Sequence, residues 1–191
     1  MQTDPLGNDL QYQRLECERT VPIPVSIIRG YIDAHDSVTD TEIIELARIA
    51  CDLAEERTMR SIFWSQWELK HRRGDIILPR APIREVKQVQ IKNGRKWVDV
   101  DLKNEEAFEQ YWQNNESRYI KIKQWQPGQQ IKVTYMAGYK EEDYILGNIP
   151  ASIYKYILNL CVSEYLKEPL SKEIQSEQKF MLNRFEGLNI W

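Results

Sequence analysis

The feature that most constrains the fold is a change of hydrophobic period along the chain. Between Thr39 and Thr58 apolar residues recur at spacings of three and four, which is typical of a helix with one buried face. Over residues 61–138 the period falls to two, as in β-strands, and helical spacing returns over 149–167. The sequence therefore predicts an α+β fold: a helical core with an antiparallel β-sheet module, residues 61–138, inserted between its helices.

The long helix over 39–58 has a well-marked start. Thr39 followed three residues later by Glu42 predicts a capping box, in which each side chain satisfies a backbone N–H of the first turn. The residues predicted to be buried are Ile43, Leu46, Ala47, Ala50, Leu53 and Ala54. The charged residues predicted to form the solvated face, rather than an acid/base site, are Glu42, Glu45, Arg48, Asp52, Glu55 and Glu56.

Three further helical segments are expected around it. A short helix over 25–34 is weakened by Gly30, which costs about 1 kcal/mol relative to Ala. A helix over 149–167 has Pro150 in its first turn and ends before Pro169, and residues 171–185 carry a loose helical period. Residues 1–24 contain Pro and Gly without a sustained period and are interpreted as an arm with one short strand around 12–16.

The β-module carries two turn signals. Asn93-Gly94 separates two alternating runs between Val89 and Val100, which is the favoured chemistry of a two-residue hairpin turn. Runs over 120–123 and 131–135 flank Pro127-Gly128, and we expect a second hairpin there.

Two proline and glycine positions predict how the chain enters and leaves the sheet. Pro79 and Pro82 are expected to bracket a rigid corner that ends one strand and aims the next. Gly138 is expected to let the chain leave the sheet sharply towards Pro150.

The charge and the apolar content of the sequence limit the kinds of partner that the protein is expected to bind. The formal net charge is −3, so the chain as a whole lacks the positive field that drives non-specific binding of phosphates. Basic clusters over 70–73 and 92–96 are interpreted as charge that serves solubility and blunts sheet edges. No stretch approaches the ~20 apolar residues of a membrane span, and MQTDPLGNDL lacks a basic segment followed by an apolar run, so neither a membrane partner nor a secretory leader is expected.

Signals of catalysis are weak throughout the sequence. His35 and His71 have no companion at metal or catalytic spacing, and no P-loop, G-x-S-x-G, G-x-G-x-x-G or H-E-x-x-H motif occurs. Cys17, Cys51 and Cys161 are odd in number and far apart, which favours free, buried or partly buried thiols. We therefore expect no enzyme, no metal and no cofactor; a hydrolase that uses carboxylates of the Glu42 helix stays as an alternative.

A succession of segments resembles a known family. In order these are IPVSIIRGYID, ACDLAEERTMR, SQWELKHR, IILPRAPIREVKQVQI, IKVTYMAGY and IPASIYKYILNLCVSEYL. This succession resembles the head-tail connector proteins, also called adaptor or head-completion proteins, of tailed bacteriophages and gene transfer agents. The resemblance covers residues 12–166. Its most specific positions are Trp67, Leu78, Pro79, Pro82, Gly138 and Pro150, beside the structural turn at Asn93 and Gly94.

The resemblance implies a structural function without an active site. Family members form a dodecameric ring under the portal protein, which joins head to tail and lets DNA pass through its channel. The distal face receives a head-closure or tail protein. The implied location is the head-tail interface of the virion, with host cytoplasm during assembly, and residues 25–168 would form a single connector domain.

The C-terminal residues 169–191 lie beyond the resemblance and are unusually apolar for a chain end. We expect Phe180, Phe185, Ile190 and Trp191 to dock onto the portal. Two other functions stay open at this point: a nucleic-acid-binding module that uses sheet aromatics and basic hairpin tips, and another virion joining protein such as a head-closure or tail-terminator protein.

Overall fold

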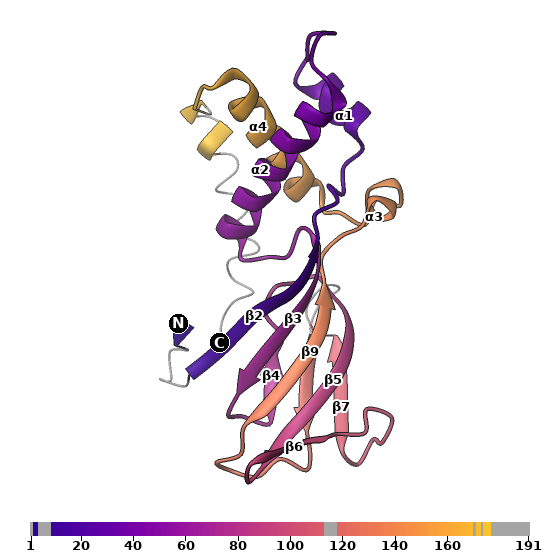
Figure 1. Cartoon of the computed structure of the whole chain (residues 1–191), viewed down its shortest axis with the longest axis vertical. Helices are drawn as coiled ribbons and strands as arrows, with labels where there is room; N and C mark the ends of the chain where they lie inside the picture. The colour runs from indigo at the N-terminus through magenta and orange to yellow at the C-terminus, as the bar shows by residue number, and fades with distance from the viewer. Residues whose placement is uncertain (1, 4–8, 113–117, 170, 173, 177–191) are drawn as a thin grey trace. The chain divides into compact units, whose positions relative to one another are not determined.

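The computed structural model describes residues 2–3, 9–112, 118–169, 171–172 and 174–176 (Figure 1). The chain forms two compact units, which are described separately below. The sheet unit comprises the described residues within 1–17 and 65–138, and the helical unit comprises the described residues within 18–64 and 139–176. Helices and antiparallel sheets occur in separate parts of the chain, so the predicted α+β class is confirmed.

The helical unit is built around two long helices. Helix α2 (Asp40–Thr58) packs along α4 (Ala151–Leu166), and α1 (Val25–Tyr31) contacts both (Figure 1). The capping box is confirmed, since Thr39 Oγ1 accepts from the Glu42 N–H at 3.3 Å and a Glu42 carboxylate oxygen accepts from the Thr39 N–H at 2.8 Å.

The remaining helix bounds differ from the prediction in small ways. Helix α1 ends three residues early, because Asp33 with φ +49° turns the chain. Pro150 caps α4, which ends where Lys167 adopts a left-handed conformation. A short helix α3 (Glu141–Ile145) was not predicted. The expected helix over 171–185 lies largely outside the described residues.

The buried face of α2 corrects the prediction at three positions. Ile43, Ala47, Ala50 and Ala54 are buried as expected, but Leu46 is only partly buried and Leu53 is exposed. Glu55, predicted on the solvated face, is only 6% exposed. Helical period places Glu55 at the boundary of the two faces, and the segment after the helix then covers it.

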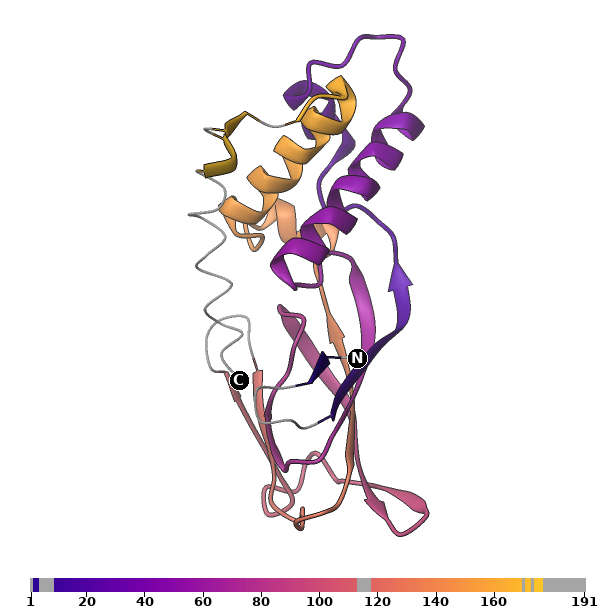
Figure 2. The same ribbon diagram turned by 90° about the vertical axis from the view of Figure 1, so that its left-hand side faces the viewer.

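Two antiparallel sheets form the sheet unit. The first has the order β1-β2-β3-β9-β5-β6, made of β1 (Gln2–Thr3), β2 (Asp9–Glu18), β3 (Trp64–His71), β9 (Ile131–Ala137), β5 (Ile83–Asn93) and β6 (Lys96–Asp99). The second has the order β4-β8-β7, made of β4 (Asp75–Ile77), β8 (Arg118–Ile122) and β7 (Phe108–Trp112). Figure 2 shows the sheets as two layers, and apolar residues from both share one core. The strand expected around 12–16 is present as the longer β2.

The Asn-Gly hairpin is confirmed. Strands β5 and β6 pair in antiparallel register, with Asn93 opposite Lys96 and Lys92 opposite Trp97. Gly94 has φ +59°, the left-handed conformation that this turn requires.

The predicted second hairpin is wrong. Strand β8 pairs with β4 and β7, whereas β9 pairs with β3 and β5, so the two runs belong to different sheets. The turn at Pro127-Gly128 exists, with Gly128 at φ +92°, but it carries the chain from one layer to the other. Ile120 and Ile131 alternate correctly and are both buried, because they reach the same core from opposite sheets.

Candidate assembly surfaces

The sequence motif residues gather at one corner of the sheet unit. Trp67 pairs opposite Tyr135 across β3 and β9, and the Tyr135 hydroxyl donates to the carbonyl of Pro79 at 2.9 Å. The Gly138 N–H donates to the carbonyl of Pro82 at 3.1 Å. These bonds join the end of β9 to the segment that leads into β5.

The other motif positions lie elsewhere. Leu78 is buried just before the corner, Asn93 and Gly94 form the turn at the opposite end of β5, and Pro150 belongs to the helical unit. The motif is therefore a set of fold determinants and not one site.

Aromatic and cationic groups stack beside the corner. The Arg14 and Arg80 guanidinium groups lie 4.7 and 5.2 Å from the centre of the Trp67 ring, and Arg80 donates to the Tyr12 hydroxyl at 3.2 Å. Burial raises the pKa of the Tyr135 hydroxyl well above its usual range, so it stays protonated and acts as a hydrogen-bond donor. This cluster ties β2 to the rest of the sheet.

The carboxylates of α2 do not form an acid/base pair. The hydrogen bond from the Thr39 backbone, followed by that from its side chain, lowers the pKa of Glu42, which therefore stays ionised. Glu55 instead accepts hydrogen bonds from the N–H groups of Ile62 and Phe63. Both carboxylates thus serve backbone donors.

Histidines and cysteines give no metal or nucleophile site. His35 Nδ1 lies 2.9 Å from the Ser37 hydroxyl, and His71 is buried at the end of β3. Over the ranges that the structure describes, no group of three His, Cys, Asp or Glu side chains could hold a metal ion. Cys51 and Cys161 are buried free thiols, as predicted, and desolvation raises the pKa of both.

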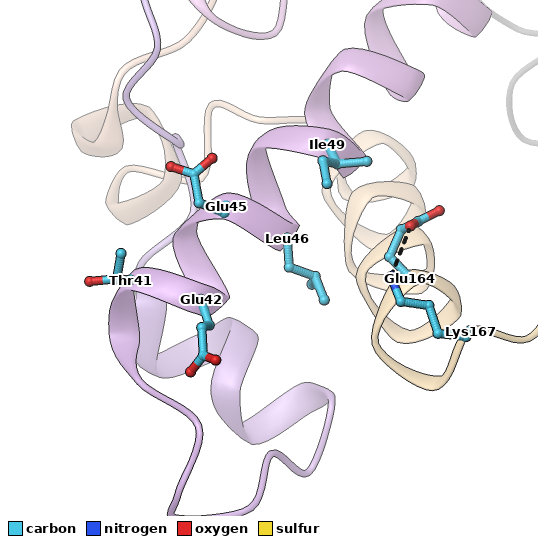
Figure 3. A pocket seen from close by; sticks show the side chains of 7 residues that line it. All are labelled: Thr41, Glu42, Glu45, Leu46, Ile49, Glu164 and Lys167. Carbon is cyan, nitrogen blue, oxygen red and sulfur yellow. Dashed lines mark ion pairs between the residues drawn. The ribbon is translucent and has the colours of Figure 1, made fainter.

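A groove between α2 and the end of α4 is the clearest candidate contact surface of the helical unit (Figure 3). This open groove has a volume of about 330 Å³, and Leu46 and Ile49 point from α2 towards the end of α4. Glu164 and Lys167, 3.8 Å apart, form an ion pair on the α4 side. Glu42 and Glu45 add acidic groups to the lining, so the groove has an apolar floor with a charged border.

Sequence reasoning missed this groove because it assigned a single apolar face to α2. Leu46, Ile49 and Leu53 follow one another at spacings of three and four, which describes a second apolar stripe on the same helix. Ile49 is 47% exposed, a large fraction for an isoleucine in a long helix. This second apolar repeat was the feature of the sequence from which the groove could have been predicted.

A second exposed apolar group lies on the smaller sheet. Tyr111 and Tyr119 stack across β7 and β8 with ring centres 4.5 Å apart, and Trp112 lies beneath the Arg118 guanidinium at 4.3 Å. Strand β7 is at the edge of its sheet. Exposed aromatic residues on an edge strand are typical of protein contact surfaces.

The predicted docking residues Phe180, Phe185, Ile190 and Trp191 all lie outside the described residues. Among the helices that the structure describes, none is long and apolar enough to cross a membrane.

Comparisons with known proteins found similar structures but no similar sequence. The sequence matches no protein-family model, and no curated protein matches it. A chain from the neck of an empty GTA particle with C6 symmetry is similar in structure, with 15% identity, a TM-score of 0.62, and coverage of 81% of this chain and 83% of that chain. A chain from the virion of a native gene transfer agent (GTA) particle gives 15% identity, a TM-score of 0.62, and coverage of 81% and 84%. A chain from the neck of a native GTA particle with C12 symmetry gives 17% identity, a TM-score of 0.55, and coverage of 81% and 82%.

At sequence identities of 15 to 17%, the structural similarity establishes the fold of this chain. The resemblance to connector proteins, predicted from the order of the sequence segments, is thus matched by a fold that occurs in the neck of GTA particles.

Proposed function

We propose that this chain is a structural joining protein in the neck of a phage-like particle, and specifically its head-tail connector. The observation that carries the proposal is the agreement between a sequence resemblance and a structural similarity. The sequence segments resemble connector proteins, and the fold is similar over 81% of the chain to chains of GTA necks and virions.

The function is self-assembly into a ring under the portal, with twelve copies around a channel through which DNA passes. Identical head-to-tail interfaces close into a ring when each subunit is rotated correctly. GTA necks treated with C6 and C12 symmetry support such an arrangement. The distal face of the ring would receive a head-closure or tail protein.

The α2–α4 groove is the surface we assign to a neighbouring copy. Its floor of Leu46 and Ile49 offers apolar area, while Glu42, Glu45 and the Glu164–Lys167 pair offer a charged border that sets orientation. A head-to-tail ring needs one such receptive surface on every subunit.

Particle location and chemistry follow from this function. The protein would work at the head-tail interface of the virion after assembly in host cytoplasm, without catalysis. The described carboxylates and thiols support a structural function, because Glu42 and Glu55 serve backbone donors and Cys51 and Cys161 stay protonated. Head closure or tail termination is the alternative joining function.

Electron microscopy of the full chain mixed with the portal of the same particle tests the proposal. We expect rings of this chain stacked on the portal rim. Rings that bind only the tail protein would instead indicate a head-closure or tail-terminator function. Failure to bind either portal or tail protein would overturn the proposal.

A further inference from the structure

Two basic segments that are distant in the sequence meet at one end of the six-stranded sheet. In the β-ladder, Lys70 of β3 lies opposite Lys132 of β9, and Lys132 lies opposite Gln90 of β5. One step further along, Lys92 of β5 lies opposite Trp97 of β6. The end of β3, the start of β9 and the β5–β6 turn therefore form one surface, at the lower end of the sheet in Figure 1.

The charge of this surface is opposite to that of the chain. Residues 70–75, 90–97 and 129–133 contain one acidic residue, Asp75, in a chain with a net charge of −3. The same ranges contain seven basic residues, which we call the basic end: Lys70, Arg72, Arg73, Lys92, Arg95, Lys96 and Lys132. Such segregation is not needed for solubility, which an even distribution of charge would provide.

Most of this positive charge is not neutralised within the chain. Lys70 pairs with Glu68 at 3.0 Å, and Arg73 pairs with Asp75 at 3.6 Å. In the part of the chain that the structure describes, no carboxylate forms an ion pair with Arg72, Lys92, Arg95, Lys96 or Lys132. Five cations therefore remain available to an external anion.

Trp97 holds two of these lysines in place. The Lys132 and Lys92 ammonium groups lie 5.0 and 5.8 Å from the centre of the Trp97 ring. Lys92 also donates to the Gln130 side chain at 3.3 Å. Cation–π contacts of this kind restrict the side chains and reduce the entropy that binding would cost. Because the lysines occupy the neighbourhood of its ring, Trp97 is a support for them and not a platform for nucleobases.

The dimensions fit a polyanion with closely spaced charges. From β3 to β6 the surface crosses three inter-strand steps, a width of about 14 Å. Duplex DNA carries one negative charge per roughly 1.7 Å of its axis, so several phosphates face a surface of this width. Phosphate contacts carry no sequence information, so a contact made through these lysines would be independent of DNA sequence.

We propose that the basic end contacts the phosphate backbone of duplex DNA. The inference deepens the proposed function, because it names the surface of a connector that would touch passing DNA, but its test needs only the purified chain. Sequence analysis interpreted the two basic segments as solubilising charge. Their convergence with Lys132 around Trp97 is the structural observation that favours phosphate contact.

Fluorescence anisotropy with a labelled duplex of arbitrary sequence tests this inference. The variant is Lys70→Gln, Lys92→Gln and Lys132→Gln in the full chain, because the strand register places these three side chains on one face of the sheet. The matched control is Lys87→Gln, Lys103→Gln and Arg118→Gln, which removes the same charge from the sheet unit away from the basic end. Circular dichroism and urea unfolding of both variants verify that each is folded.

At about 50 mM salt we expect the basic-end variant to bind at least about tenfold more weakly than the natural chain, and the control variant to change less than about twofold. The slope of log affinity against log salt should fall by about 2 to 3 in the basic-end variant, since three phosphate contacts are lost. Equal weakening of both variants, or no DNA binding by the natural chain at low salt, would overturn the inference.

Two further experiments distinguish DNA binding from other functions of the basic end. Polyglutamate competing as well as DNA at equal charge would assign the surface to an acidic protein and overturn the DNA inference. In electron microscopy, a basic-end variant that still stacks on the portal but has lost DNA binding supports the inference. A natural chain that stacks on the portal without binding DNA overturns this inference alone and leaves the proposed function intact.

Discussion

The Glu55 carboxylate accepts the backbone N–H groups of Ile62 at 2.7 Å and of Phe63 at 3.0 Å through the same oxygen, Oε1. Glu55 is 6% exposed, and Ile62 and Phe63 are fully buried. The bonds fix the turn by which the chain leaves α2. A carboxylate buried in this way is stabilised because it accepts hydrogen bonds from two buried backbone donors.

Replacement of Glu55 by Ala should lower the free energy of unfolding by about 2 to 4 kcal/mol, because two buried donors lose their acceptor. Glu55→Gln should cost less, since the amide oxygen can accept both bonds. Urea unfolding followed by circular dichroism measures the difference, with Glu56→Ala at the exposed neighbouring position as the control. An equal loss for the Gln and Ala variants would show that the charge, and not the acceptor, is what matters.

Gly30 and Gly94 should respond to alanine in opposite directions. Gly94 adopts φ +59°, so Gly94→Ala strains the hairpin turn and should destabilise the protein by about 1 kcal/mol. Gly30 lies within α1, and a Cβ added there meets nothing within 4 Å. Gly30→Ala should therefore stabilise by about 0.5 to 1 kcal/mol. Thermal unfolding of both variants checks the signs, and a loss at Gly30 would contradict the prediction.

Local signals predicted local structure well. The capping box of Thr39 and Glu42 and the Asn93-Gly94 turn each depend on residues close together in the chain, and each is present. Such features follow from backbone geometry and short-range hydrogen bonds.

Strand pairing between segments distant in the chain was harder to predict from the sequence. Alternation correctly marked residues 120–123 and 131–135 as strands, but the period of two does not identify a partner, and the predicted hairpin between them is wrong. Glu55 and Leu53 were assigned to the wrong burial classes for a related reason, since helical period alone does not show which parts of α2 other segments cover. The basic end likewise became visible only through strand register.

Thiol reactivity should distinguish the three cysteines. Burial raises the pKa of the Cys51 thiol, and it raises the pKa of Cys161 to about 12. A raised pKa leaves less thiolate at a given pH, so both buried thiols should react slowly at pH 8. We expect an aromatic disulfide reagent to modify partly exposed Cys17 rapidly and the other two only after unfolding in urea. Rapid modification of all three thiols in native buffer would contradict this assignment.

The α2–α4 groove can be tested by a single polar substitution. Ile49 is 47% exposed, so Ile49→Ser removes little buried area and should change the unfolding free energy by less than about 1 kcal/mol. If a neighbouring copy occupies the groove, the same variant should reduce the fraction of subunits found in rings on the portal. Val98→Ser, at a 51% exposed position of the sheet unit, is the matched control. Unimpaired ring assembly by Ile49→Ser would remove the groove from the subunit interface.

The last prediction concerns the apolar C-terminal residues. Docking of Phe180, Phe185, Ile190 and Trp191 onto the portal would bury large apolar groups, and each fully buried side chain contributes about 1.5 to 3 kcal/mol. Deletion of the residues after Pro169 should therefore weaken portal binding strongly. A full-length variant with Ser at the four apolar positions should weaken it to a similar extent, which separates apolar contact from chain length. Light scattering or surface plasmon resonance on immobilised portal measures the affinity, and unchanged binding by the truncated chain would rule out C-terminal docking.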